Sequence, residues 1–382
     1  MSLRKLARSL VLIVSLPLAL TTCGGAAFED PAQIKGLRVI AVQKSAPYPR
    51  PGDRVNIKLV FWDGKSTEDA PRDIFVYISP TPCENPKGDL YYNCLTELGG
   101  GSTDVPDGGA PDGDVPDGDV PDGDAPDGDV PEGGAARRGP DFVRATAPEQ
   151  ASALHDINHV REINVRISDT IIERHAETRG VQPYGLAYVL FIACAGMPRP
   201  VLNARTNELP FGCFDAQGNK LGADDFVIGY TSMYVYNERI NHNPVVDDFL
   251  FDAASLADST TTTDETLIRH IPSCKESDRS KCPKYQLQAA INRSLTVEKD
   301  DDPTAKTPDG QQLEEQAWVS FYITAGQLKS SLRLVNDATR GWNEQNGTEY
   351  TAPAEPGPVR IFAVVHDNRG GVAWTEGKII VD

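Results

Sequence analysis

Two histidines and a group of aspartates are the residues whose types and spacing could hold a metal ion. His155 and His159 are four positions apart, so on a helix they would share a face and could bind a transition metal with an acidic third ligand. The favoured interpretation is two exposed loop histidines. Asp114, Asp117 and Asp119 could offer oxygens to calcium, but their uneven spacing and the prolines in that stretch oppose convergence on one cation. We therefore expect no resident cofactor, and at most weak calcium binding.

Cysteines are the next candidates for chemistry. The chain has seven, and six fall into pairs that are close in sequence: Cys83 with Cys94, Cys194 with Cys213, and Cys274 with Cys282. An even set of thiols in an oxidising compartment favours disulfides, and local pairing is the least contorted of the roughly fifteen connectivities. Zinc ligation is disfavoured, because the sequence has no Cys-x-x-Cys and no histidine at zinc-site spacing beside them. The sequence predicts three local disulfides.

Motifs of common enzyme classes are missing from the sequence. It contains no Gly-x-Ser-x-Gly, no His-Glu-x-x-His and no phosphate-binding glycine-rich loop that opens a helix. The formal net charge of −18 repels phosphate backbones, and no basic stripe interrupts it. We expect a chain that is not an enzyme and does not bind nucleic acid.

The first residues have the layout of a secretory signal. Arg4, Lys5 and Arg8 precede an apolar run over residues 10–20. A helix of this length rises only about 16 Å, whereas the hydrocarbon core of a bilayer is roughly 30 Å thick. Residues 1–22 are therefore predicted to be a cleaved signal peptide and not a membrane span.

The residues around Cys23 follow this run directly. Leu20-Thr21-Thr22-Cys23-Gly24 resembles the bacterial lipobox, in which the cysteine is acylated and becomes the mature N-terminus. Thr22 departs from the Gly, Ala or Ser usual at its position, and the alternative is an ordinary signal peptide with a cysteine nearby. The resemblance implies lipid on Cys23, a lipid tether over residues 23–36 and membrane contact through lipid alone. Gly24 in place of aspartate favours the outer membrane.

Strand patterns dominate the rest of the chain. In residues 55–62, for example, Val55, Ile57, Leu59 and Phe61 alternate onto one face. Strands are expected over 37–42, 55–62, 73–79, 162–167, 186–194 and 226–236, and, beyond the turn residues 241–244, over 245–251, 285–291, 317–324, 328–335, 359–366 and 372–381.

A low-complexity stretch separates the third and fourth of these strands. Residues 105–134 repeat a five-residue unit rich in Pro, Asp and Gly, which has too little apolar surface to build a core. Three strands before the stretch are too few to close a sandwich, so they need partners from beyond it. We interpret residues 99–140 as a disordered acidic insertion within a first domain.

The domain organisation follows from this spacing. With turn-rich loops between strands and no helical crossovers, the sequence predicts an all-β fold of two tandem antiparallel sandwiches. The first is expected over 37–240 and the second over 241–382.

Several segments resemble a known family. Residues 37–42 with Pro51-Gly52-Asp53 resemble the opening of bacterial immunoglobulin-like domains, and residues 318–326 and 357–371 resemble their middle and final strands. With Asn241-His242-Asn243-Pro244, the chain is similar to myxobacterial-type outer-envelope lipoproteins. The resemblance implies immunoglobulin-like sandwiches and brings no catalytic residue with it.

The leading hypothesis is a non-enzymatic, lipid-anchored protein of the cell envelope. It would act as a binding, adhesion or structural module whose partners are envelope proteins or glycans, with the membrane contacted through the N-terminal lipid. Two alternatives remain: a metal-dependent hydrolase that uses His155 and His159, and a calcium-responsive adhesin.

Overall fold

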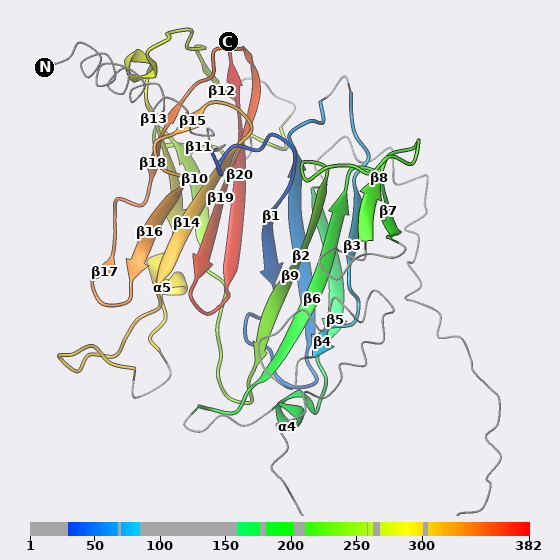
Figure 1. Ribbon diagram of the computed structural model, residues 1–382. Helices are drawn as coiled ribbons and strands as arrows, with labels where there is room; N and C mark the ends of the chain where they lie inside the picture. Colours follow the sequence, from blue (N-terminus) through cyan, green and yellow to red (C-terminus); the bar gives the residue numbers. More distant parts are fainter. Residues whose placement is uncertain are drawn as a thin grey trace, which may run out of the picture.

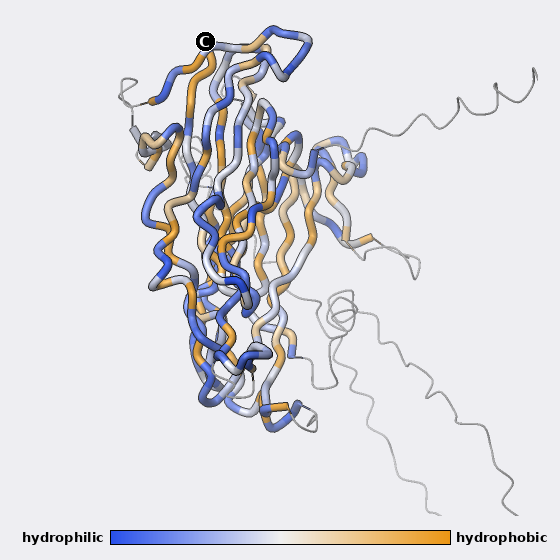
Figure 2. Tube along the Cα trace, turned by 90° about the vertical axis from the view of Figure 1, so that its left-hand side faces the viewer, coloured by the Kyte–Doolittle hydropathy of each residue, from blue (hydrophilic) through white to orange (hydrophobic). Residues whose placement is uncertain are grey.

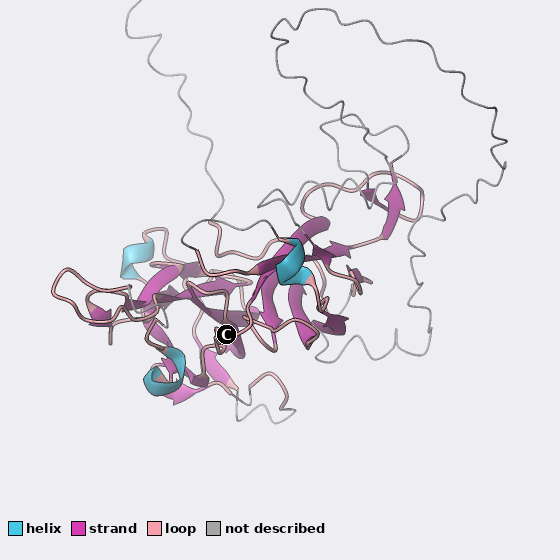
Figure 3. Cartoon of the chain, turned by 90° about the horizontal axis from the view of Figure 1, so that it is seen from below, coloured by secondary structure: helices cyan, strands magenta, loops and turns pink. Residues whose placement is uncertain are grey.

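The computed structural model describes residues 30–382 except 68–69, 85–158, 176–180, 202–210, 258, 263–267 and 301–304. These residues form an all-β protein, in which the strands, magenta in Figure 3, greatly outweigh the helices, cyan in the same view. The helices of the described residues are α4 (Ile171–Arg174), α5 (Arg293–Thr296) and the short 3-10 helix η4 (Arg279–Lys281). No helix in the described part of the chain has the length and apolar character that crossing a membrane requires. The strands form two sandwiches that lie side by side in Figure 1.

Sandwich 1 holds the strands that precede the acidic stretch together with strands that follow it. Its strands are β1 (Leu37–Lys44), β2 (Arg54–Asp63), β3 (Phe75–Ile78), β4 (Cys83–Glu84), β5 (Val160–Arg166), β6 (Gly185–Cys194), β7 (Met197–Pro200), β8 (Phe211–Phe214) and β9 (Phe226–Val235). One sheet has the order β1-β2-β5, and in the other β6 pairs with β3, β4 and β9. The central strand β2 pairs with β5 from Arg54 opposite Arg166 to Val60 opposite Val160, so strands on both sides of residues 85–158 share one sheet.

Sandwich 2 contains the C-terminal strands. They are β10 (Val246–Phe251), β11 (Ala254–Ser255), β12 (Arg269–Ile271), β13 (Tyr285–Ile291), β14 (Ala317–Ile323), β15 (Gln327–Leu328), β16 (Leu332–Asp337), β17 (Gly341–Trp342), β18 (Thr348–Thr351), β19 (Gly357–Asp367) and β20 (Val372–Val381). The sheets have the orders β11-β10-β13-β18-β15 and β12-β20-β19-β14-β16-β17.

Both sandwiches divide their main strands in the same way. In sandwich 1 the first, second and fourth main strands, β1, β2 and β5, form one sheet, while β3, β6 and β9 form the other. In sandwich 2 the corresponding sets are β10, β13 and β18 against β14, β19 and β20. This division between two packed antiparallel sheets is that of the immunoglobulin fold. The predicted all-β fold of two immunoglobulin-like sandwiches is confirmed.

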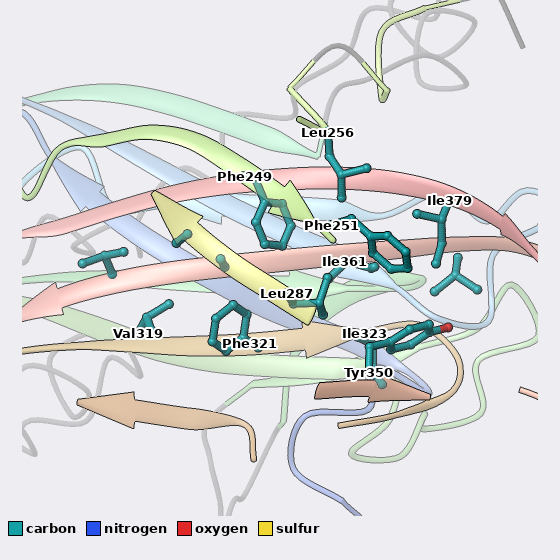
Figure 4. Packing of buried hydrophobic residues seen from close by; sticks show 14 of the residues in the cluster. Phe249, Phe251, Leu256, Leu287, Val319, Phe321, Ile323, Tyr350, Ile361 and Ile379 are labelled. Atoms are coloured by element: carbon teal, nitrogen blue, oxygen red, sulfur yellow. The ribbon is translucent and has the colours of Figure 1, made fainter. Parts of the chain in front are cut away.

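The core of sandwich 2 lies between its two sheets. Strand β14 alternates buried and half-buried positions, so Val319, Phe321 and Ile323 point inward. They meet Phe249 and Phe251 from the facing sheet (Figure 4). Along the chain, Figure 2 shows apolar residues concentrated in the strands and polar residues in the loops. This period-two burial is the physical cause of the sandwich.

One predicted strand, over residues 328–335, is wrong as a single element. The structure divides it into β15, which pairs with β18, and β16, which pairs with β14 in the opposite sheet. Gly326 precedes the division with a φ of 94°, and an added Cβ there would lie 2.6 Å from the backbone oxygen of Thr351. The chain changes sheets between Leu328 and Leu332, which alternating hydrophobicity cannot reveal.

The residues just before β1 belong to the folded body, although the sequence assigns them to the tether. Ala32 and Ile34 are buried, and the backbone of this segment pairs in parallel with the end of β14. The amide of Ile34 donates to the oxygen of Ile323 at 2.8 Å, and the amide of Ile323 donates to Ala32 at 2.9 Å. The chain therefore contacts sandwich 2 before it enters sandwich 1.

A shared core joins the two sandwiches. It lies between the outer face of the β1-β2-β5 sheet and the outer face of the β14-β19-β20 sheet. Its buried members are Ile34, Ile40, Ala41 and Val60 from the N-terminal side and Phe362, Val364 and Val372 from sandwich 2. Trp62 of sandwich 1 packs on Phe362 with ring centroids 5.6 Å apart. Because apolar surface of both units is removed from water here, relative motion of the sandwiches is opposed.

Candidate functional site

Two of the three expected cysteine pairs lie within the described residues. Cys194 and Cys213 are bonded, with Cα atoms 5.7 Å apart, and so are Cys274 and Cys282, at 5.8 Å. Cys83 is also disulfide-bonded. Cys94, the partner expected for it, and Cys23 lie outside the described residues. Disulfides of this kind persist in oxidising compartments, which supports a location outside the cytoplasm.

Of the metal candidates, His159 alone lies within the described residues. Asp114, Asp117, Asp119 and His155 lie outside the described residues. His159 stacks on Trp62, with ring centroids 3.9 Å apart, and burial lowers its pKa to about 4, aided by the nearby Arg360 and Arg161. A site with two guanidinium groups beside the imidazole repels cations. The described ranges contain no group of three or more His, Cys, Asp or Glu side chains arranged for a metal ion.

A charged cluster lies at the junction of the sandwiches, at the end of β1 and β19 opposite the N-terminal segment. Lys44 is the last residue of β1 and is only 4% exposed. Its ammonium group donates a hydrogen bond to the backbone oxygen of Ser232 at 3.0 Å. Burial lowers the pKa of Lys44 to about 8, while the nearby carboxylate of Asp367 acts in the opposite direction. Lys44 thus brings a buried cation of sandwich 1 to the β19–β20 turn of sandwich 2.

Asp367 organises that turn. Its Oδ1 accepts from the amides of Arg369 at 2.7 Å and Gly371 at 2.8 Å, which fixes the hairpin. Burial raises the pKa of Asp367, and these bonds together with Asn241 and Lys44 oppose the rise. A buried carboxylate with several donors is an anchor for the elements that supply them.

Arg369 extends the cluster into sandwich 2. Its Nε lies 3.2 Å from Oε1 of the buried Glu315, and its Nη1 lies 3.9 Å from Glu298. Burial raises the pKa of Glu315 to about 8, despite the opposite pull of Arg369. Glu298 also pairs with His242 of the connecting segment.

The segment that connects the sandwiches is clamped by two asparagines. Asn241 donates to Asp367 at 3.2 Å. The Nδ2 of Asn243 donates to the oxygen of Lys44 at 2.6 Å, while its Oδ1 accepts from the amide of Val372 at 2.9 Å. One side chain thus ties a backbone oxygen of sandwich 1 to a backbone amide of sandwich 2.

Positive and negative side chains alternate through this junction, so the cluster is suited to holding elements together. Sequence reasoning missed Lys44, Glu315, Asp367 and Arg369. One signal was available: Lys44 ends a mainly apolar strand, and Glu315 stands two residues before the strand that begins at Ala317. Charged residues at the ends of apolar strands are usually solvated, so this signal is ambiguous.

A second feature at the same end is a hollow of about 400 Å³, open to solvent, beside α5. It is lined by Asn292, Arg293, Ser294, Val297 and Glu314. The guanidinium of Arg293 lies over the Trp342 ring, 5.9 Å from its centroid. The lining combines a cation, an anion, an amide and a hydroxyl, which could donate to and accept from a polar ligand.

Comparisons with known proteins identify no family. No family model matches the chain, and no curated protein matches it. Among solved structures the chain is similar to the D00-D0 domain of intimin, with 10% identity, a TM-score of 0.20, and coverage of 91% of this chain and 98% of that chain. At this TM-score the likeness supports no argument, and the fold rests on the strand pairing described above.

Proposed function

We propose that the chain is a lipid-anchored, non-enzymatic module of the cell envelope, held by acyl groups on Cys23, that presents one end of a rigid pair of sandwiches to envelope proteins or glycans. The observation that carries the proposal is the folding of residues 32–34 onto β14. Only seven positions separate Cys23 from Asp30, where the described chain begins, which is a reach of about 25 Å. A lipid on Cys23 would therefore hold the body close to the bilayer.

The strand directions support one orientation. Strand β1 starts beside the N-terminal segment and ends at Lys44, and β19 starts at the same end and finishes at Asp367. The eleven residues of β19 span roughly 35 Å, so the charged junction and the hollow would lie far from the anchor. Figure 1 shows the C-terminus at one end of the strands and α4, α5 and the connecting segment at the other.

The N-terminal contact also has a mechanical consequence. Because Ala32 and Ile34 bond to β14 and Leu37 begins β1, a pull from the tether is shared by both sandwiches. The shared core and the asparagine clamp oppose bending between them. These features suit a spacer or adhesion module, which must transmit force and hold its distal loops in place.

A partition experiment tests the anchor. The full chain and the Cys23→Ser variant would be expressed in a bacterium with a lipoprotein pathway, and each would be partitioned between detergent and aqueous phases. We expect the wild type in the detergent phase and the variant in the aqueous phase, with an acylated Cys23 peptide found by mass spectrometry only in the wild type. A processed wild-type chain that begins after Cys23 and partitions into water would contradict the proposal.

A further inference from the structure

We propose that the hollow beside α5 binds an uncharged saccharide of the cell envelope. The hollow lies where β13 ends and α5 begins, at the end of sandwich 2 opposite the N-terminal segment. The inference rests on the proposed function only for the source of the saccharide; the chemistry of the hollow stands on its own residues.

The two charged residues of the hollow have no ion-pair partner within the described residues. Arg293 and Glu314 both line it, and neither takes part in a described salt bridge or side-chain hydrogen bond. Other charges at this end take part in salt bridges: Arg369 with Glu315 and Glu298, and Arg239 with Asp300. A guanidinium and a carboxylate that face one hollow and remain unpaired are available to a ligand.

The remaining polar groups are held in place. Asn292 accepts from the amide of Leu295 and from the hydroxyl of Ser294, and it donates to Asp247 at 3.2 Å. The guanidinium of Arg293 lies over the ring of Trp342, which helps to hold it in place. Preorganised polar groups lower the cost of binding, because little side-chain entropy is lost when the ligand arrives.

The ligand class follows from the charges. A ligand with a net charge would be attracted to one of Arg293 and Glu314 and repelled by the other. A sugar hydroxyl both donates and accepts, so neighbouring hydroxyls of a neutral saccharide can satisfy the guanidinium and the carboxylate together. The hollow is open, which suits one or two units of a longer chain better than a small molecule that must be enclosed. An open site of this size predicts a Kd on the order of 1 mM.

A titration of the full mature chain with defined probes tests the proposal. Ligand-observed NMR would follow maltotriose and chitotriose as neutral saccharides, sialic acid as an anion and trialanine as a peptide. We expect at least one neutral saccharide to bind, and Arg293→Met and Glu314→Gln each to raise its Kd about tenfold. Arg54→Met and Glu173→Gln, which change exposed residues of sandwich 1, should leave it unchanged.

Three outcomes would overturn the proposal: no binding by either neutral saccharide at 20 mM, tighter binding of trialanine or sialic acid, or saccharide binding that Arg293→Met and Glu314→Gln leave intact. All variants replace exposed or half-buried side chains, and unchanged circular dichroism would show that they fold. Partition of the chain into detergent through Cys23 is independent of these results, so failure here leaves the proposed anchor untouched.

Discussion

The two sandwiches share a strand arrangement but differ in where they bury their apolar residues. Sandwich 2 buries its apolar residues mainly in one core between two sheets. Sandwich 1 has a smaller central core, and it also buries two outer faces. The outer face of the β1-β2-β5 sheet packs against sandwich 2. Every residue of β6 is buried, and its outer face packs against neighbours that include Phe211 and Cys213 of β8. The shared core covers one outer face of each sandwich, so the difference lies in the central cores, and sandwich 1 has the smaller core of its own to stabilise it.

The largest expected effect on stability comes from truncating a buried side chain in the core of each sandwich in turn. Phe321→Ala in sandwich 2 and Leu59→Ala in sandwich 1 both remove fully buried side chains, and each should cost about 3–5 kcal/mol of unfolding free energy. Because sandwich 1 has the smaller central core, it should be less stable once the shared core is lost, so Phe321→Ala should expose both sandwiches to hydrogen exchange, while Leu59→Ala should expose sandwich 1 alone. Hydrogen-exchange mass spectrometry on peptides from β2 reports on sandwich 1, and on peptides from β19 it reports on sandwich 2. If β2 stays protected from hydrogen exchange in Phe321→Ala while β19 exchanges, the prediction that sandwich 1 opens together with sandwich 2 is contradicted.

The next effect tests the shared core. Phe362→Ala removes a fully buried ring between the sandwiches and should cost about 3 kcal/mol, measured by denaturant unfolding. Leu332→Ala is the matched control, because Leu332 belongs to the same sheet but is 57% exposed. We expect the control to change stability by less than about 0.5 kcal/mol. Equal effects of the two substitutions would show that the contact between sandwiches contributes little.

A pH experiment sharpens the account of the junction. The folded pKa of Glu315, about 8, lies above its ordinary value, so the folded state holds an extra proton between about pH 4.5 and 8. Stability contributed by this group is therefore present below pH 4.5 and is lost as pH rises toward 8. In Glu315→Gln the contribution of this group should vanish, a difference on the order of 5 kcal/mol across the window. If the difference in unfolding free energy between the wild type and Glu315→Gln stays constant from pH 4.5 to 8, the raised pKa of Glu315 is contradicted.

The sequence was sufficient for the fold because period-two burial determines it. Residues 285–291 and 372–381 were predicted as strands and form β13 and β20 over those same residues. Short elements were missed: β17 and β18 have two and four residues, too few for a periodic signal. The junction was also missed, because Lys44, Asp367 and Asn243 are 124 to 323 positions apart and meet only when the sandwiches pack.

The smallest effect concerns the edge of sandwich 2. Asp252 and Ala253 form the turn between β10 and β11 with φ angles of 46° and 65°, a region that side chains with a Cβ disfavour. Ala253→Gly should relieve this and raise stability by up to about 1 kcal/mol, measured by thermal unfolding. Coupling between the sandwiches should not change. Destabilisation by this substitution would mean that the turn is held by contacts of the alanine methyl.

The most direct test of the central claim, that the two sandwiches form one rigid body, is a distance distribution between spin labels on each of them. Arg54 of sandwich 1 and Gln327 of sandwich 2 are exposed and suit replacement by labelled cysteine in a Cys23→Ser background. The account predicts one narrow distribution by pulsed electron paramagnetic resonance, which broadens when Phe362→Ala is added. A broad or multimodal distribution without that substitution would contradict it.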